Sequence, residues 1–96
     1  MKGYWIILGE EITDTAAQEH YGCLWKPIAE QYGATLKPLD NAMLKEGGDT
    51  RRFFAVEFDS LAKAQACYND PAYTEAMKYA LRASRRQLLI IEGNLA

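Results

Sequence analysis

The segment Gly3–Gly9 reads Gly-Tyr-Trp-Ile-Ile-Leu-Gly and restricts the possible folds more than any other part of the chain. Successive side chains of a β-strand point to opposite faces of a sheet, so a strand with one face in water should alternate apolar and polar residues. This segment does not alternate, and both of its faces are apolar. The side chains on one face are Tyr4, Ile6 and Leu8, and those on the other are Trp5 and Ile7.

Two later segments show the same property. Residues 51–58 predict a strand with Phe54, Val56 and Phe58 on one face and Phe53 and Ala55 on the other. Residues 87–92 predict a strand whose centre is the run Leu88-Leu89-Ile90-Ile91. A weaker strand is expected over residues 34–39, where Pro38 cannot donate a ladder hydrogen bond and therefore favours a sheet edge or a bulge.

Helical periodicity separates these strands. Apolar residues at steps of three and four predict a helix that starts at Thr13 or Asp14, is kinked at Pro27 and stops at Gly33. Ser60 is expected to cap a second helix that runs to about Tyr68.

The second helix is expected to restart at Asp70-Pro71, since an aspartate can cap a helix and proline is tolerated in its first turn. The residues of its expected inner stripe are Tyr73, Ala76, Met77, Ala80 and Leu81.

The resulting order, βαββαβ, is that of the ferredoxin-like α+β fold. We therefore predict one domain over residues 1–96, with a four-stranded antiparallel sheet and both helices on one side. Helices on one side leave the other apolar face of the sheet uncovered. A large exposed apolar patch usually marks an interface, so we predict a homodimer whose two sheets pack face to face. The alternative is a monomer with its C-terminal segment over the sheet, for which only Asn94-Leu95-Ala96 follow the last strand.

Composition excludes several classes of protein. A 49% hydrophobic and 25% charged chain is ordinary for a globular domain, and the formal charge of −2 predicts neither nucleic-acid nor membrane binding. The chain has no apolar run of transmembrane length and no signal peptide, so we expect a cytoplasmic protein with Cys23 and Cys67 as reduced thiols. One histidine and two distant cysteines match no metal-ligand spacing, so we expect no metal and no cofactor.

Several segments together resemble domain-of-unknown-function family 1330, which is similar to the dimeric α+β barrel superfamily. The segments that carry the resemblance are Lys2–Ile6, Tyr21 to Gly33 with Pro27 between them, Glu57-Phe58 before Ser60, Tyr68–Tyr73 and Ile91–Gly93. The resemblance implies a dimeric barrel of two face-to-face sheets. Relatives in the superfamily include cofactor-independent monooxygenases, haem-degrading enzymes, isomerases and binding proteins.

This chain also departs from the family pattern. The family usually carries Arg-Gly-Gly after the second strand, where this chain has Pro38–Asn41. It also tends to carry an arginine near the position of Ala80, whereas the nearest arginine here is Arg82. If the family arginines meet an anionic ligand, that site is lost or altered in this chain.

The candidate catalytic residues are His20 and Glu57. His20 could act as a general base in a pocket between helix and sheet, or be a solvated residue on the helix flank. We expect Glu57 in or near the dimer interior, where it needs a partner such as Arg52 or Tyr4, or else has a raised pKa. The candidate ligand-binding residues are Trp5, His20, Tyr21, Arg52, Glu57, Tyr68 and Tyr73, and the competing interpretation of the aromatic ones is core and interface packing.

Three functions fit these observations. The first is a homodimeric protein that binds a small organic ligand. The second is a cofactor-independent monooxygenase or isomerase that acts on an aromatic or polyketide-like substrate, with His20 or Glu57 handling a proton. The third is an RNA-binding module, because Arg51–Phe58 partly matches the third-strand motif of RNA-recognition domains. Ala55 in place of the second stacking aromatic and the acidic balance both weaken this third interpretation.

Overall fold

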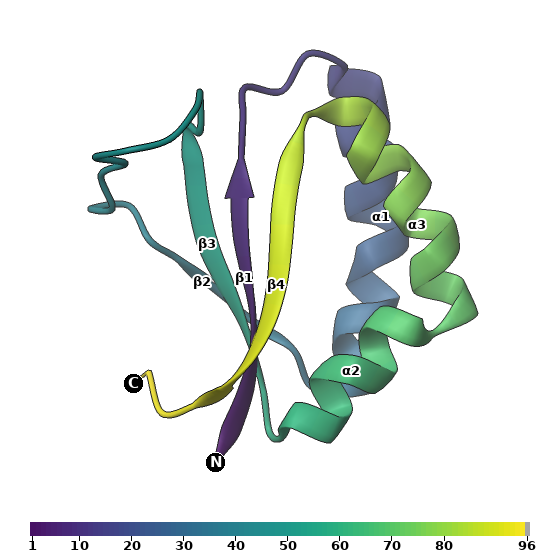
Figure 1. Ribbon diagram of the computed structural model, residues 1–96. Coiled ribbons are helices and arrows are strands. Elements are labelled where there is room, and N and C mark those ends of the chain that lie inside the picture. Colours follow the sequence, from purple (N-terminus) through teal and green to yellow (C-terminus); the bar gives the residue numbers. More distant parts are fainter. Residues whose placement is uncertain (96) are drawn as a thin grey trace.

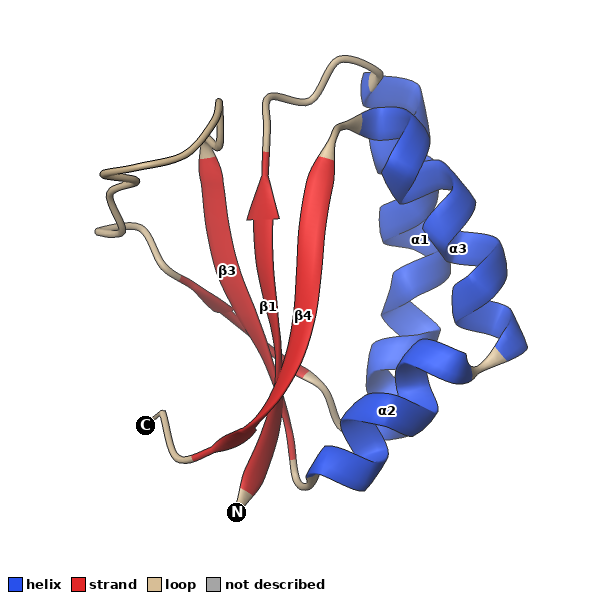
Figure 2. Cartoon of the chain, viewed as in Figure 1, coloured by secondary structure: helices blue, strands red, loops and turns tan. Residues whose placement is uncertain are grey.

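The computed structural model describes residues 1–95, which form four strands and three helices in one α+β unit (Figure 1). The elements are β1 (Lys2–Gly9), α1 (Thr15–Tyr32), β2 (Thr35–Pro38), β3 (Arg52–Phe58), α2 (Leu61–Asn69), α3 (Pro71–Ala83) and β4 (Arg86–Gly93). The predicted βαββαβ order is confirmed, with the second helix divided into α2 and α3 at Asp70. All three helices lie on one side of the sheet (Figure 2).

The strand order of the sheet is β2-β3-β1-β4, and every neighbouring pair is antiparallel. β1 is therefore central and is hydrogen-bonded along both sides. β2 has only four residues and lies at an edge, as the proline in residues 34–39 predicts. Because β2 is short and peripheral, its Leu36 side chain points to the helix side but remains 55% exposed.

The predicted helix boundaries follow from specific caps. The Asp14 carboxylate accepts a hydrogen bond from the Ala17 backbone N–H at 3.0 Å, and Gly33 ends α1 with a φ of 63°. The Ser60 hydroxyl accepts from the Lys63 N–H at 3.1 Å, and Asp70 accepts from the Ala72 N–H at 2.8 Å. A side-chain oxygen at each N-cap satisfies a backbone donor that the helix itself leaves free.

The core lies between the sheet and the helices, with Trp5 at its centre. Trp5 is fully buried, and its indole N–H donates to the Ala64 carbonyl at 2.9 Å, which ties β1 to α2. Its ring lies 4.8 Å from the ring of Tyr73 and 5.2 Å from that of Phe58. Aromatic pairs in tilted arrangements at such distances stabilise a core beyond the area they bury.

The inner stripe of α3 differs from the prediction at one position. The buried residues of α3 are Tyr73, Ala76, Ala80 and Ala83. Leu81 is 58% exposed, so its assignment to the inner stripe was wrong. Consecutive residues of a helix are about 100° apart around the axis, so Leu81 points away from the sheet when Ala80 points toward it.

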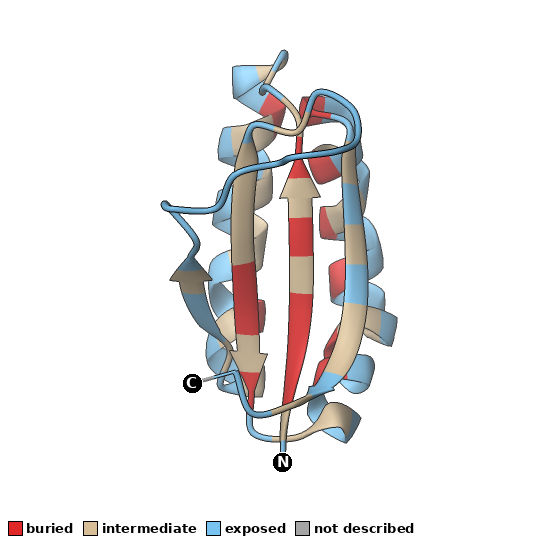
Figure 3. Cartoon of the chain, turned by 60° about the vertical axis from the view of Figure 1, so that its left-hand side comes forward, coloured by how far each residue is buried: buried red, intermediate tan, exposed pale blue. Residues whose placement is uncertain are grey.

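The register of the strands shows which residues face away from the helices. Trp5 and Ile7 belong to the helix-side core, so their neighbours on β1 face the other side of the sheet. Five of the outward-facing apolar residues form what we call the open-face patch: Ile6, Leu8, Phe53, Leu89 and Ile91. All five are at least partly exposed, and Leu89 is 47% exposed (Figure 3 shows this face with the helices behind it).

The C-terminal segment covers one end of this face. The Leu95 backbone N–H donates to the Tyr4 hydroxyl at 3.1 Å, and Tyr4 is only 1% exposed. Leu95 therefore reaches only this one end of the face, and the open-face patch stays at least partly exposed, as so short a C-terminal segment predicts.

The close packing of β1 against the start of α2 predicts opposite effects for two glycines. A Cβ on Gly3 would lie 2.4 Å from the Ser60 carbonyl oxygen and 2.7 Å from the Leu61 backbone, so Gly3→Ala should destabilise the protein by about 1–3 kcal/mol. Apart from its chain neighbours and the backbone of its own helix, a Cβ on Gly22, within α1, meets no atom of residues 1–95 within 4 Å. Gly22→Ala should therefore stabilise by about 0.5–1 kcal/mol through helix propensity. Urea unfolding of both variants tests this, and equal stabilities would contradict it.

Candidate functional site

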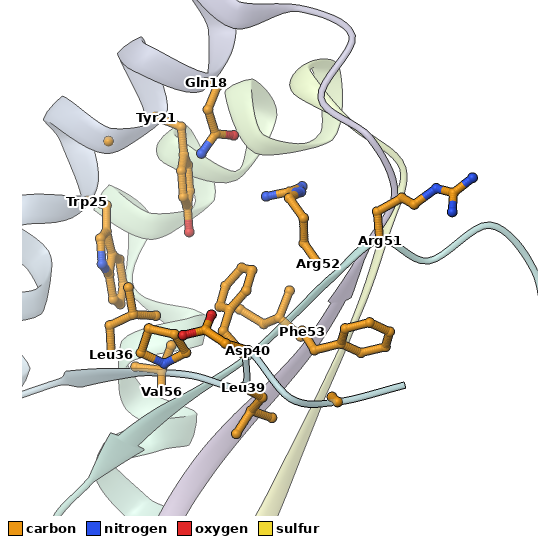
Figure 4. Close-up of a pocket in the computed structure, with 15 residues that line it drawn as sticks. Gln18, Tyr21, Trp25, Leu36, Leu39, Asp40, Arg51, Arg52, Phe53 and Val56 are labelled. Atoms are coloured by element: carbon orange, nitrogen blue, oxygen red, sulfur yellow. The ribbon is translucent and has the colours of Figure 1, made fainter. Parts of the chain in front are cut away.

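A pocket of about 530 Å³ opens between α1 and the β2 edge of the sheet (Figure 4). It exists because β2 extends the sheet beyond the area that the helices cover. The segment that follows β2 closes part of its rim. The lining residues are Ile7, Gln18, Tyr21, Gly22, Trp25, Leu36, Pro38, Leu39, Asp40, Ala42, Arg51, Arg52, Phe53, Phe54 and Val56.

One face of α1 forms the helical wall of the pocket. Gln18, Gly22 and Trp25 follow each other at steps of four and three, which places them on the same side of a helix, and Tyr21 lies beside them. Val56 on β3 is part of the opposite wall. The pocket is therefore lined mainly by aromatic and aliphatic groups, with few polar ones.

Arg52 supplies a cationic group to this lining. Its Nε donates to the Glu10 carbonyl at 3.0 Å, and its Nη2 donates to the Ser84 hydroxyl at 2.7 Å. The guanidinium lies over Gly9, where a Cβ would come within 2.7 Å of Nη2. Burial, and secondly the charge of Arg86, lower the pKa of Arg52, because both disfavour its charged form.

Arg86 lies on the other side of Gly9, since both arginines pair with that residue across neighbouring strands. Arg86 Nη2 donates to the Tyr73 hydroxyl at 2.6 Å, and the Tyr73 and Tyr21 hydroxyl oxygens are 3.2 Å apart. Burial raises the pKa of Tyr73 well above its ordinary value, so this phenol stays protonated at neutral pH. Three polar side chains thus connect the interior with the pocket wall.

Neither arginine has an acidic partner among the residues that the structure describes. The ion pairs within residues 1–95 are formed by lysines with Glu57, Asp59 and Glu75. Asp40 lines the pocket but is exposed and forms no ion pair there. Unpaired positive charge next to an apolar cavity favours the binding of an anion, because a buried charge without a counter-ion is costly.

The seven predicted ligand-binding residues divide between different parts of the molecule. Tyr21 and Arg52 line the pocket, and the Tyr73 hydroxyl lies behind that of Tyr21. Trp5 and Tyr68 pack together in the core, where the Tyr68 hydroxyl donates to the Met77 sulfur at 3.5 Å. The aromatic residues of this set therefore include both pocket and core members.

His20 lies outside the pocket. Its ring stacks on that of Tyr79 with 3.9 Å between centroids, and both belong to the outer, helical layer. His20 is exposed, although Tyr21 beside it in sequence lines the pocket. One helical step turns the side chain by about 100°, which removes His20 from the cavity.

Glu57 lies on the opposite face of the sheet from the pocket. Its carboxylate is 3.0 Å from Lys37 Nζ and 3.5 Å from Lys2 Nζ. The expected Arg52 partner was wrong, since Arg52 lies an odd number of positions earlier on the same strand and faces the helices. A raised pKa was also wrong: the hydrogen bond and charge of Lys37, aided by Lys2, lower the pKa of Glu57.

The RNA-recognition interpretation depends on aromatic residues on the open sheet face. Val56 and Phe58, which match the motif, are buried in the helix-side core. Phe53 belongs to the open-face patch, but its outward neighbours on β3 are Ala55 and Glu57. The face therefore provides one motif aromatic next to a carboxylate, which is a poor stacking platform for bases.

Sequence reasoning missed Arg86 and Gln18 as residues of the site. The available signal for Gln18 was its helical spacing from Tyr21. Arg86 lies just before the strand predicted over residues 87–92 but is the first residue of β4. No group of three His, Cys, Asp or Glu side chains suited to a metal occurs in the described part of the chain. Nor does any helix in residues 1–95 have the length and apolar character that crossing a membrane requires.

The fold and the pocket define a ferredoxin-like α+β protein with one helix-covered and one open sheet face. Residues 2–94 match the family described as Domain of unknown function (DUF1330), and the chain belongs to that family. No curated protein matches the chain significantly in sequence.

Solved structures confirm the fold. RPA0582, a protein of unknown function from Rhodopseudomonas palustris, is 18% identical, with 99% of this chain and 84% of that chain covered and a TM-score of 0.68. A dimeric ferredoxin-like protein of unknown function from Jannaschia sp. CCS1 is 12% identical, with 97% and 100% covered and a TM-score of 0.68. SnoaB, a cofactor-independent oxygenase from Streptomyces nogalater, is 8% identical, with 99% and 95% covered and a TM-score of 0.60.

The position of Glu57 between two lysines predicts a pH-dependent contribution to stability. A carboxylate whose pKa is lower in the folded than in the unfolded protein stabilises the fold above its unfolded pKa, and this is lost as the pH falls through the folded pKa. Glu57→Gln should therefore be less stable than the wild type at pH 7, and the difference should shrink as the pH falls through the lowered pKa of Glu57.

Urea unfolding at pH 7 and pH 3 measures this difference. Asp59→Asn is the matched control, because the Asp59 side chain is 69% exposed and also contacts Lys2. It should show little change at either pH. A Glu57→Gln variant as stable as the wild type at pH 7 would refute the assignment.

Proposed function

We propose that this protein is a homodimer that binds a small organic ligand in the pocket of each protomer. The pocket itself is the observation that supports ligand binding. Its volume of about 530 Å³ is within the range of about 300–1,000 Å³ of small-molecule sites. Its walls are mainly apolar, and the polar side chains of its lining are those of Gln18, Tyr21, Asp40, Arg51 and Arg52. Such a lining can enclose the apolar body of a ligand and orient its polar end.

The open-face patch supports the dimer. Its side chains come from the three strands β3, β1 and β4, so they form a continuous apolar surface on one side of the sheet. Full burial of one large apolar side chain is worth about 1.5–3 kcal/mol, so mutual burial of two such patches offsets much of an association cost of about 4–15 kcal/mol. The structure from Jannaschia sp. CCS1, which is similar in fold, is dimeric.

An enzymatic role receives less support from the site. His20 and Glu57, the two expected proton-handling residues, lie on the helical exterior and on the open sheet face respectively. The resemblance to SnoaB is one of fold. We therefore propose binding and assign no reaction.

The proposed dimer predicts that a charge within the open-face patch separates the protomers. Leu89→Glu should convert a particle of twice the 10.8 kDa chain mass into a monomer in sedimentation equilibrium at micromolar concentration. Leu81→Glu is the matched control, because Leu81 is similarly exposed but lies on α3. A wild-type protein that sediments as a folded monomer would refute the dimer.

The proposed ligand site predicts that bulk at Gly22 blocks binding without unfolding the protein. Gly22 lines the pocket, and a Cβ there meets open space within residues 1–95, so Gly22→Phe can place its ring in the cavity. A neutral aromatic probe, 2-naphthamide, at ten times its Kd should stabilise the wild type by about 1.4 kcal/mol, which raises Tm by roughly 5–10 °C.

Gly22→Phe should lose this shift, whereas Gly22→Ala should keep it. Thermal unfolding with and without the probe measures all three proteins. An equal shift in Gly22→Phe would place the binding elsewhere. Mass spectrometry of natively purified protein should in addition detect a retained small molecule.

A further inference from the structure

The hydrogen-bonded series Arg86–Tyr73–Tyr21 has a direction that its chemistry determines. A guanidinium carries N–H donors and no acceptor, so the Tyr73 oxygen accepts the 2.6 Å hydrogen bond from Arg86. Tyr73 is completely buried, and its own hydroxyl proton needs an acceptor. Within residues 1–95, the other hydrogen-bond partner of this hydroxyl is the Tyr21 oxygen at 3.2 Å.

The direction continues to the pocket wall. When Tyr73 donates to Tyr21, the Tyr21 oxygen acts as acceptor and its proton is left to point elsewhere. Tyr21 lines the pocket, and Figure 4 shows its hydroxyl at the end of the ring that extends from α1 into the cavity. The Arg86 guanidinium also lies 5.2 Å from the Tyr21 ring centroid, which adds positive potential to the phenol. Tyr21 is thus a polarised donor that faces the cavity.

Arg52 provides a second donor on the opposite wall. Its Nε and Nη2 are used by the Glu10 carbonyl and the Ser84 hydroxyl, which hold the guanidinium in place. Its Nη1 has no hydrogen-bond partner in the described part of the chain. In Figure 4 the Arg52 side chain rises from β3 toward the space beside Tyr21. Two donors, one cationic and one neutral, therefore converge on one end of an apolar cavity.

On the basis of the function proposed above, we propose that the ligand is a small aromatic or apolar carboxylate. Arg52 and Tyr21 bind its carboxylate group, and Arg86 and Tyr73 are positioning residues that orient the Tyr21 proton. The apolar body of the ligand then lies against Trp25, Leu36 and Val56. Arg52 and the Tyr21 proton are both donors, so this pair favours a carboxylate over the carboxamide of the same shape, because an amide NH₂ group that faces the guanidinium would lack an acceptor there. The acceptors of the pocket lining belong to Gln18 and to the exposed Asp40.

Matched acid and amide probes test this ligand class. 2-Naphthoate and 2-naphthamide have nearly the same shape and differ in charge and acceptor capacity. Calorimetric titration of the wild-type protein should show naphthoate binding about tenfold or more tightly than naphthamide. Equal affinities would refute the carboxylate assignment but leave the ligand pocket of the proposed function intact. Failure of both probes to bind would refute both proposals.

Isosteric variants test the hydrogen-bonded series Arg86–Tyr73–Tyr21, which we call the relay. Tyr21→Phe should reduce the preference for naphthoate by about tenfold, because it removes one donor to the carboxylate. Tyr73→Phe keeps both arginines and the ring packing, and should reduce the preference by about threefold or more. The Tyr73→Phe effect should disappear when Tyr21 is already phenylalanine, since the relay then has no end point. A Tyr73→Phe protein with unchanged preference would refute the relay.

Arg86 variants separate orientation from packing. Arg86→Lys keeps a donor-only cation, so it should retain most of the preference for naphthoate, whereas Arg86→Met should lose it. Circular dichroism checks that each variant is folded. Should Arg86→Met fail to fold, the Tyr73→Phe comparison still decides the proposal. Equal preference in folded Arg86→Met and wild-type protein would refute the role of Arg86.

Discussion

The whole structure depends on the central position of β1, a strand that is apolar on both faces. Its backbone pairs with β3 on one side and β4 on the other, so all its ladder groups are satisfied by antiparallel neighbours. Its helix-side residues, Trp5 and Ile7, then form the centre of the core, and Ile6 and Leu8 are left on the open face. The packing of the helices and the exposure of the open-face patch both follow from this one placement.

The site arises at the end of the same strand. Gly9 has Arg52 on one side and Arg86 on the other, and the missing Cβ leaves room for the Arg52 guanidinium. Two positive charges close together in a partly buried place are unfavourable unless something negative joins them. For the stability of the fold, apolar side chains in place of Arg52 and Arg86 would serve as well. An anionic ligand, as proposed above, would supply that negative charge.

The two faces of the sheet therefore have different chemistry. The helix side combines a dry aromatic core around Trp5 with a cationic pocket at its β2 edge. The open side is apolar along its middle, and the Glu57 carboxylate at its margin is neutralised by Lys2 and Lys37. A ligand in the pocket and a second protomer on the open face would meet different surfaces except at Phe53, the one member of the open-face patch that also lines the pocket. A fold with few elements can in this way hold a binding site and an interface at once.

The amino-acid sequence by itself determined the order of the elements, their caps and the presence of two apolar sheet faces. These features depend on interactions within a few residues: Asp14, Ser60 and Asp70 cap the helices that follow them, Gly33 ends α1, and the periods of the apolar residues separate strand from helix. Only the tertiary structure decided which face met the helices. The strand register placed Glu57 away from Arg52, one helical step removed His20 from the pocket, and pairing across Gly9 brought Arg86 to the site. The physical reason is that successive side chains of a strand point to opposite faces of the sheet. The sequence therefore shows which residues share a face but not which face the helices cover. That choice depends on contacts between residues far apart in the chain, such as the hydrogen bond from Trp5 to Ala64.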